Sequence, residues 1–169
     1  PDLVLIKVPK TLALLQDQLC RLKPLLHDNS RIIAAGMAKH IHRSTLNLFE
    51  QLIGPAHTSL AWKKARLIFC TPDPQLKPSA SPYPSRYRLE NSDYLISNHA
   101  NVFSRETLDI GTRLFLQHIP TLKHRPDDPD RQTIIDLGCG NGIVGILASE
   151  RNPTAQIQFV DESYMALDS

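Results

Sequence analysis

Short apolar runs alternate with stretches of helical periodicity over the first 70 residues. The runs have the length of buried strands and are mostly apolar, although Lys7 and Arg66 interrupt two of them. The stretches between them repeat leucine or phenylalanine every three or four positions, as an amphipathic helix does. The pattern predicts strands at 4–8 and 32–36, helices at 12–26 and 46–53, and two further strands at 59–62 and 65–70 joined by a tight, basic turn. This order of elements is typical of an α/β fold.

The second half of the chain follows a proline-rich stretch. Five prolines fall within residues 72–84, which favours a semi-rigid linker at 71–85. We therefore expect two units, 1–70 and 86–169. The later elements predicted are a hairpin with strands at 86–90 and 94–98, a helix at 107–119, an acidic loop at 126–130, and a strand–helix–strand unit at 133–137, 143–151 and 156–160.

Composition narrows the class of protein. The chain has 169 residues, 41% hydrophobic and 21% charged, so it is expected to bury a core and not to be disordered. No run of 18 apolar residues occurs, so no membrane span is predicted. The three cysteines (Cys20, Cys70, Cys139) are far apart, which argues against a disulfide framework or a zinc site. With no secretory signal expected, a reducing, cytoplasmic location is predicted.

Charge is distributed unevenly along the chain. Residues 1–70 carry ten Lys or Arg against four acids, whereas the rest carries nine against thirteen. A basic half fits an anionic partner, although solvated surface lysines explain the same count. Trp62 with Lys63, Lys64 and Arg66 is the candidate RNA contact, by base stacking and phosphate charge. The alternative is a core tryptophan beside a solvated turn.

The main chemical signal lies at the end of the strand predicted at 133–137. Asp136 is followed by glycines at 138, 140 and 142, with Cys139 and Asn141 between them. Glycines let the chain turn sharply and let a ligand lie against bare backbone, and the next helix directs free N–H groups toward the loop. Gly138, Cys139, Gly140, Asn141 and Gly142 are therefore the predicted cofactor loop, and Asp136 is expected to accept from an ammonium group or to orient this loop.

A second acid follows the next predicted strand. Asp161 comes 25 residues after Asp136, and a carboxylate at that place can accept the hydroxyls of a ribose. One cofactor with a cationic amino acid at one end and a ribose at the other matches both acids. The pattern predicts S-adenosylmethionine. Phe103 is expected to pack on this cofactor or on a flipped base, or to be a core aromatic.

Other assignments compete with this prediction. Residues 140–145 also spell G-x-G-x-x-G, with Asp161 about 20 residues beyond, as in a dinucleotide site of an oxidoreductase. That match is weaker because Asp136 and Gly138 occupy places where the dinucleotide fingerprint has buried apolar residues. A tight turn without a ligand is a further alternative. His40 and His42 lack a third ligand, so no metal site is predicted.

Further motifs resemble a known family. Residues 99–111, HANVFSRETLDIG, resemble the segment that precedes the cofactor strand in small-domain ribosomal RNA guanine methyltransferases. Residues 4–11 and 60–66 resemble the large-subunit guanine-N2 methyltransferases of the RlmG type, a tandem-domain family shared with RsmC. The resemblance covers essentially the whole chain and is weaker to RsmC in the first half.

The resemblance has direct implications for fold and function. It implies Rossmann-like class I methyltransferase topology in tandem half-domains. Residues 1–70 would be the C-terminal part of a degenerate methyltransferase-like domain, and 86–169 the N-terminal part of the S-adenosylmethionine-binding catalytic domain. The implied activity is methylation of guanine N2 in 23S ribosomal RNA, with 16S ribosomal RNA, an oxidoreductase or a non-catalytic RNA-binding module as alternatives.

One motif of the family does not occur in this chain. The catalytic Asn-Pro-Pro-Phe sequence is absent, and the only Asn-Pro, Asn152-Pro153, is predicted to be a helix stop. No catalytic residue is therefore assigned. The chain is expected to be an internal fragment of a longer enzyme, without turnover by itself.

Overall fold

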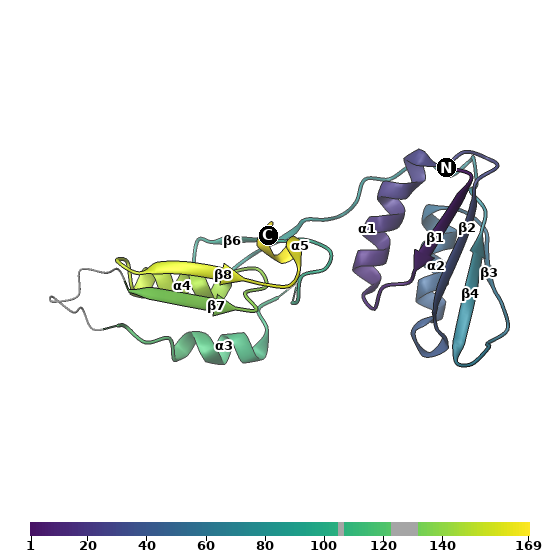
Figure 1. Ribbon diagram of the computed structural model, residues 1–169. Helices are drawn as coiled ribbons and strands as arrows, with labels where there is room; N and C mark the ends of the chain where they lie inside the picture. Colours follow the sequence, from purple (N-terminus) through teal and green to yellow (C-terminus); the bar gives the residue numbers. More distant parts are fainter. Residues whose placement is uncertain (105–106, 123–131) are drawn as a thin grey trace. The chain divides into compact units, whose positions relative to one another are not determined.

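The computed structural model describes residues 1–104, 107–122 and 132–169. It divides into two compact units, Pro1–Pro82 and Tyr83–Ser169, which are described separately (Figure 1). The predicted acidic loop at 126–130 and two positions of the segment 99–111 lie outside the described residues. No helix in the described part of the chain has the length and apolar character needed to cross a membrane.

The first unit is one four-stranded sheet with two helices on one face (Figure 1). The strand order is β1-β2-β4-β3, with β1 parallel to β2 and β4 antiparallel to both of its neighbours. The elements are β1 (Leu3–Lys7), α1 (Leu12–Leu22), the 3-10 turn η1 (Lys23–Leu25), β2 (Arg31–Met37), the 3-10 turn η2 (Ala38–His40), α2 (Arg43–Leu52), β3 (Ala56–Thr58) and β4 (Ala65–Cys70).

The core of this unit follows from the predicted periodicities. Leu15 and Leu19 of α1 and Phe49 of α2 are fully buried. They pack against the inward residues of the sheet, which include Ile32 and Ile68. Alternation along the strands therefore sends one set of side chains into the helices and leaves the other set on the opposite face.

The strand predicted at 59–62 is wrong. The partner of β4 is β3, three residues earlier, and Trp62 forms only an isolated bridge with Ala65. At Ser59 the backbone N–H still donates to the Leu67 carbonyl at 3.0 Å, but the Leu67 N–H donates to the Ser59 hydroxyl at 3.0 Å in place of a backbone carbonyl. A serine side chain competes with backbone groups for such hydrogen bonds, which shortens the strand.

The start of the proline-rich stretch is hydrogen-bonded to the first unit. The buried ammonium of Lys23 donates to the carbonyls of Ile53 at 3.1 Å and Asp73 at 2.7 Å. The Ser81 hydroxyl donates to the buried Asp17 carboxylate at 2.6 Å. The limits 71–85 that the sequence predicts for the linker stay a prediction. Within this stretch, Asp73 and Ser81 are hydrogen-bonded to residues of the first unit.

The second unit contains the predicted strand–helix–strand element within the predicted limits. Strands β7 (Thr133–Leu137) and β8 (Gln156–Val160) are parallel and connected by α4 (Ile143–Arg151). The helix predicted at 107–119 is shorter because Asp109 caps it, its carboxylate accepting from the Thr112 N–H at 3.0 Å. The other elements are the hairpin β5 (Ser85–Arg88) and β6 (Leu95–Asn98), α3 (Ile110–Gln117) and α5 (Tyr164–Leu167).

Candidate functional site

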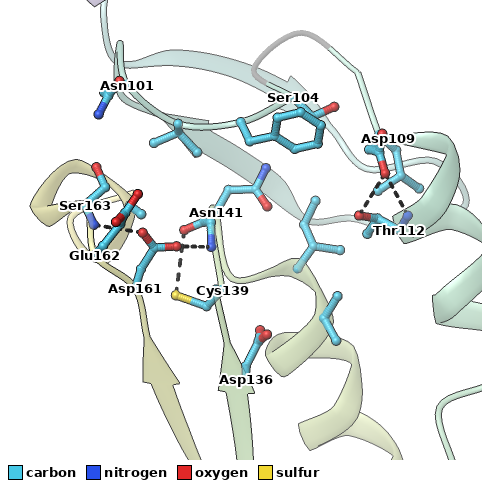
Figure 2. A pocket seen from close by; sticks show the side chains of 18 of the residues that line it. Asn101, Ser104, Asp109, Thr112, Asp136, Cys139, Asn141, Asp161, Glu162 and Ser163 are labelled. Atoms are coloured by element: carbon cyan, nitrogen blue, oxygen red, sulfur yellow. Dashed lines mark hydrogen bonds between the residues drawn. The ribbon is translucent and has the colours of Figure 1, made fainter.

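A pocket of about 340 Å³ lies in the second unit, beyond the carboxyl ends of β7 and β8. This is the end of a parallel sheet at which α/β proteins bind ligands. Figure 2 shows Asp136, Cys139, Asn141 and Asp161 on one side and Ser104 on the other. The pocket thus brings together the cofactor loop, Asp136, Asp161 and the segment containing Phe103.

The loop after β7 exposes bare backbone to this pocket. Gly138, Gly140 and Gly142 have φ values of +74°, +54° and +77°, a region that glycine adopts without steric cost. A Cβ built on Gly138 or Gly140 would meet no atom within 4 Å. The Gly138 and Cys139 N–H groups donate to the carbonyl of Val160 at 2.7 and 3.1 Å. The bend is therefore held by β8 and remains open on the pocket side.

Asp136 connects β7 to the first turn of α4. Its carboxylate accepts from the Gly145 N–H at 2.8 Å. Gly145 has no side chain because a Cβ there would clash with the ring of Phe159 and approach the Asp136 carboxylate to 3.0 Å. Burial raises the pKa of Asp136, the Gly145 N–H lowers it, and the nearby Asp161 raises it. Of the two roles expected for Asp136, the structure shows the orienting hydrogen bond.

Asp161 holds the loop from the other side. Its two oxygens accept from the N–H of Gly140 at 2.9 Å and the N–H of Ser163 at 2.8 Å (Figure 2). Backbone N–H donors at Ser163 and Gly140 lower the pKa of Asp161. Each carboxylate oxygen has two lone pairs, so both oxygens keep acceptor capacity. Glu162 also lines the pocket and adds a second carboxylate there.

The lowered pKa of Asp161 has a consequence for stability. A carboxylate whose pKa is lower in the folded state contributes stability that is complete above its unfolded pKa and is lost as pH falls through the folded one. The free energy of unfolding of the wild type should therefore exceed that of Asp161→Asn by a constant amount above about pH 5. This difference should shrink progressively below pH 3.8, the ordinary pKa of an aspartate side chain. Urea unfolding across this pH range measures the difference. A constant difference down to pH 2 would contradict the role assigned to the two N–H donors.

Phe103 lies on the pocket wall and is 75% exposed. The alternative of a core aromatic is therefore wrong. Ser104, the next residue, has a φ of +56° and donates from its hydroxyl to the carbonyl of Thr107 at 2.6 Å. Phe103 thus lines the same pocket as Asp161, and its exposed ring is available to a ligand.

Sequence reasoning missed two polar residues of the hairpin. Asn98 in β6 is fully buried and accepts from the Nδ2 of Asn141 at 2.9 Å. Tyr87 in β5 lines the pocket; burial raises the pKa of its phenol, and the Asn141 side chain lowers it. A signal for Asn98 existed, because it shares the inward position of the alternating strand with Ile96.

The Asn152-Pro153 pair ends α4, as predicted. The Asn152 amide donates to the carbonyls of Ala148 at 2.9 Å and Pro120 at 3.1 Å and accepts from the Leu122 N–H at 2.7 Å. It is 5% exposed and does not line the cofactor pocket. Asn152 is thus a structural helix terminus.

The basic residues of the first unit are arranged unequally. Trp62 is 72% exposed, with the Lys63 Nζ 4.8 Å from its ring centroid, so the core-tryptophan alternative is wrong. Lys63 and Lys64 both have positive φ values and are exposed at the turn. Arg66 is half-buried and shares the inward face of β4 with Ile68. Across the described residues, no group of three or more His, Cys, Asp or Glu is placed to hold a metal ion.

Comparison with known proteins identifies both units. Residues 1–74 match the RLMG N-terminal domain, and residues 93–169 match the methyltransferase small domain. Ribosomal RNA large subunit methyltransferase G of Erwinia tasmaniensis is 54% identical over 170 residues, covering 100% of this chain and 43% of that protein. Its counterpart from Streptomyces avermitilis is 50% identical over 173 residues, covering 99% and 44%.

A solved structure has the same fold. The T. thermophilus 16S rRNA N2 G1207 methyltransferase RsmC, in complex with AdoMet and guanosine, gives a TM-score of 0.71 at 19% identity, covering 99% of this chain and 45% of that one. The fold is thus that of a Rossmann-like methyltransferase. More narrowly, its two units match the RLMG N-terminal domain and the methyltransferase small domain, and over its whole length it is similar to ribosomal RNA large subunit methyltransferase G. It spans less than half the length of the curated relatives it matches.

Proposed function

We propose that the protein transfers the methyl group of S-adenosylmethionine to N2 of a guanine in 23S ribosomal RNA. The observation that carries the proposal is the open glycine bend between Asp136 and Asp161, facing a pocket of about 340 Å³. The relatives' names support the large ribosomal subunit over the small one. The methyltransferase small domain favours methyl transfer over a nucleotide-dependent oxidoreductase.

The residues present fit the cofactor. The empty space beside Gly138 and Gly140 is the space that a Cβ would take, so a ligand can approach the backbone there. Asp161 and Glu162 would accept ribose hydroxyls, Asp136 sets the loop beside the amino-acid end, and Phe103 would cover one face. The cofactor supplies an electrophilic methyl group bonded to a sulfonium.

The chemistry defines what the reaction further needs. An in-line displacement requires the guanine N2 to be held close to the methyl group, with acceptors for its protons. In the family these acceptors come from Asn-Pro-Pro-Phe, which does not occur in the 169 residues. Catalytic residues are therefore left unassigned in these 169 residues.

The proposal is tested by binding and by methyl transfer. Titration calorimetry of the intact protein should show binding of S-adenosylhomocysteine and none of NAD. Incubation with labelled S-adenosylmethionine should modify 23S RNA at guanine N2, with 16S RNA as the matched control. Binding of NAD alone would favour the oxidoreductase, and modification of 16S RNA alone would favour the RsmC-type substrate. RNA binding insensitive to the cofactor, without methylation, would favour the non-catalytic module.

The turn containing Lys63 and Lys64 is proposed to contact the RNA backbone, with Trp62 as a stacking surface. Replacing both lysines by alanine should weaken RNA binding and reduce the slope of log K against log salt by about 1–2, since each phosphate contact contributes roughly 0.7–0.9. Arg66→Ala should have a smaller effect because Arg66 is half-buried. Lys7 and Lys10, changed together to alanine, are the control for net charge. An equal change in slope for both pairs would contradict a specific contact.

A cytoplasmic location is also proposed. All three cysteines are free and buried, which is compatible with a reducing compartment. Ribosomal RNA, the proposed partner, supports the same assignment. Fractionation of cells with the tagged protein tests it, and recovery with the membranes would count against it.

A further inference from the structure

The cofactor loop is connected to the hairpin by one buried side chain. Asn98, the last residue of β6, is 0% exposed. Its Oδ1 accepts from the Nδ2 of Asn141 at 2.9 Å, and its own Nδ2 donates to the carbonyl of Ile96 at 3.4 Å. Asn141 lies in the loop between Gly140 and Gly142 and lines the pocket (Figure 2). The hairpin thus reaches the loop from outside the β7–α4–β8 element.

We propose that Asn98 is a positioning residue for the cofactor loop and acts through Asn141. The inference rests on the proposed cofactor and adds a function for the hairpin that precedes the cofactor strand. Asn98 does not line the pocket, so its effect on binding is transmitted by the hydrogen bond to Asn141.

The physical reason is the flexibility of the loop. A glycine loses more backbone freedom on ordering than any other residue, and three glycines alternate over five positions here. The Gly138 N–H donates to the Val160 carbonyl, and the Gly140 N–H donates to the Asp161 carboxylate, so both glycines are held from the β8 side. Asn141 is the loop residue whose side chain is held from the hairpin side, so its hydrogen bond restrains the loop between the last two glycines.

Burial makes this contact sensitive to its geometry. A buried amide left without a partner costs about 1–3 kcal/mol, so the Oδ1 of Asn98 holds the Asn141 amide in place. The hairpin therefore fixes the direction of one loop side chain through Asn98, and the loop is pre-organised before the ligand arrives.

A double-mutant cycle on the intact protein tests the inference. Asn98→Ala and Asn141→Ala should each weaken S-adenosylhomocysteine binding about tenfold, equivalent to about 1.4 kcal/mol. The double variant should bind no more than about twofold weaker than either single variant, because both changes remove one interaction. Calorimetry gives the affinity, and urea unfolding of the same samples gives the stability. Losses that multiply to about a hundredfold would show that Asn141 acts independently of Asn98 and would overturn the inference.

Asn152→Ala is the matched control. Asn152 is also a buried, fully hydrogen-bonded asparagine of the same unit, outside the pocket. Asn152→Ala should lower the free energy of unfolding as Asn98→Ala does and leave the affinity for S-adenosylhomocysteine unchanged. If both variants lost the same affinity, Asn98 would have only a general structural role.

A conservative variant keeps the test valid if Asn98→Ala does not fold. Asn98→Asp retains an acceptor for the Asn141 amide, so its affinity should stay within about threefold of wild type. A tenfold loss with this variant would overturn the inference. Failure of the wild type to bind S-adenosylhomocysteine would refute the proposed function instead, so the two failures are distinguishable.

Discussion

Replacing Gly140 by leucine should reduce the affinity for S-adenosylhomocysteine by about a hundredfold or more, equivalent to about 2.8 kcal/mol. Gly140 lines the pocket, and a Cβ built on it would meet no atom within 4 Å. A leucine side chain would therefore occupy the space assigned to the cofactor without displacing other residues of the protein. Isothermal titration calorimetry of wild type and variant measures the loss.

Gly140→Ala separates the effect on the backbone from the effect on the pocket. Both variants must adopt a φ of +54°, which costs a residue with a side chain roughly 1–2 kcal/mol. Their free energies of unfolding should therefore fall by similar amounts, whereas only leucine blocks the ligand. If leucine and alanine bound the cofactor equally, the open side of the bend would not be its site.

The limits of β7, α4 and β8 could be predicted from the sequence. Each strand is a short run bounded by polar or turn residues, and the glycine bend fixes where β7 ends and α4 begins. These are local signals, since the φ values of the glycines and the apolar period depend on neighbouring residues. The approach of Asp136 and Asp161 to one loop then follows from parallel pairing of the two strands.

Long-range pairing explains what could not be predicted. The end of β3 depends on the Ser59 hydroxyl meeting the Leu67 N–H, a contact across eight residues that a pattern does not contain. The role of Asn98 depends on the hairpin lying against a loop 43 residues later. Phe103 is 75% exposed on the pocket wall, whereas the apolar pattern alone fits a core position as well.

Asp136 and Asp161 show the same difference between what the sequence predicts and what only the structure shows. Their positions at the carboxyl ends of adjacent strands predict that both face one pocket, and both line it in the structure. Their partners were not predictable: Asp136 accepts from Gly145, and Asp161 from Gly140 and Ser163. Each carboxylate therefore stabilises the loop, and the ligand binding proposed for Asp161 would add to a structural function.

Replacing Gly54 by alanine should be the most destabilising single change in the first unit. Gly54 has a φ of +154°, and a Cβ there would lie 2.6 Å from the Asp73 backbone nitrogen and clash with the Thr71 carbonyl. These are backbone atoms that cannot rotate away. We expect a loss of about 3 kcal/mol or more in the free energy of unfolding, since backbone strain and overpacking each cost about 1–3 kcal/mol.

The hydrogen bonds around Gly54 explain why the clash cannot relax locally. The Asp73 N–H donates to the Ile53 carbonyl at 2.8 Å, and Lys23 donates to the carbonyls of both residues. Moving Asp73 away from a new Cβ would break its bonds to Ile53 and Lys23 and leave the buried Lys23 ammonium with only the Ile53 carbonyl, which is costly. The substitution should therefore release the start of the proline-rich stretch together with the end of α2.

Gly36→Ala is the control for this prediction. Its Cβ would contact only the side chains of Val8 and Ile41, at 3.3 and 3.4 Å, which can shift slightly. We expect a change within about 1 kcal/mol, because alanine also reduces the entropy of the unfolded chain. Buried Cys20 and Cys70 report on this unit, so the rate of thiol labelling in urea, followed by peptide mass analysis, measures its unfolding apart from Cys139. Equal labelling in the two variants would show that the anchoring of residues 71–73 contributes little to the stability of the unit.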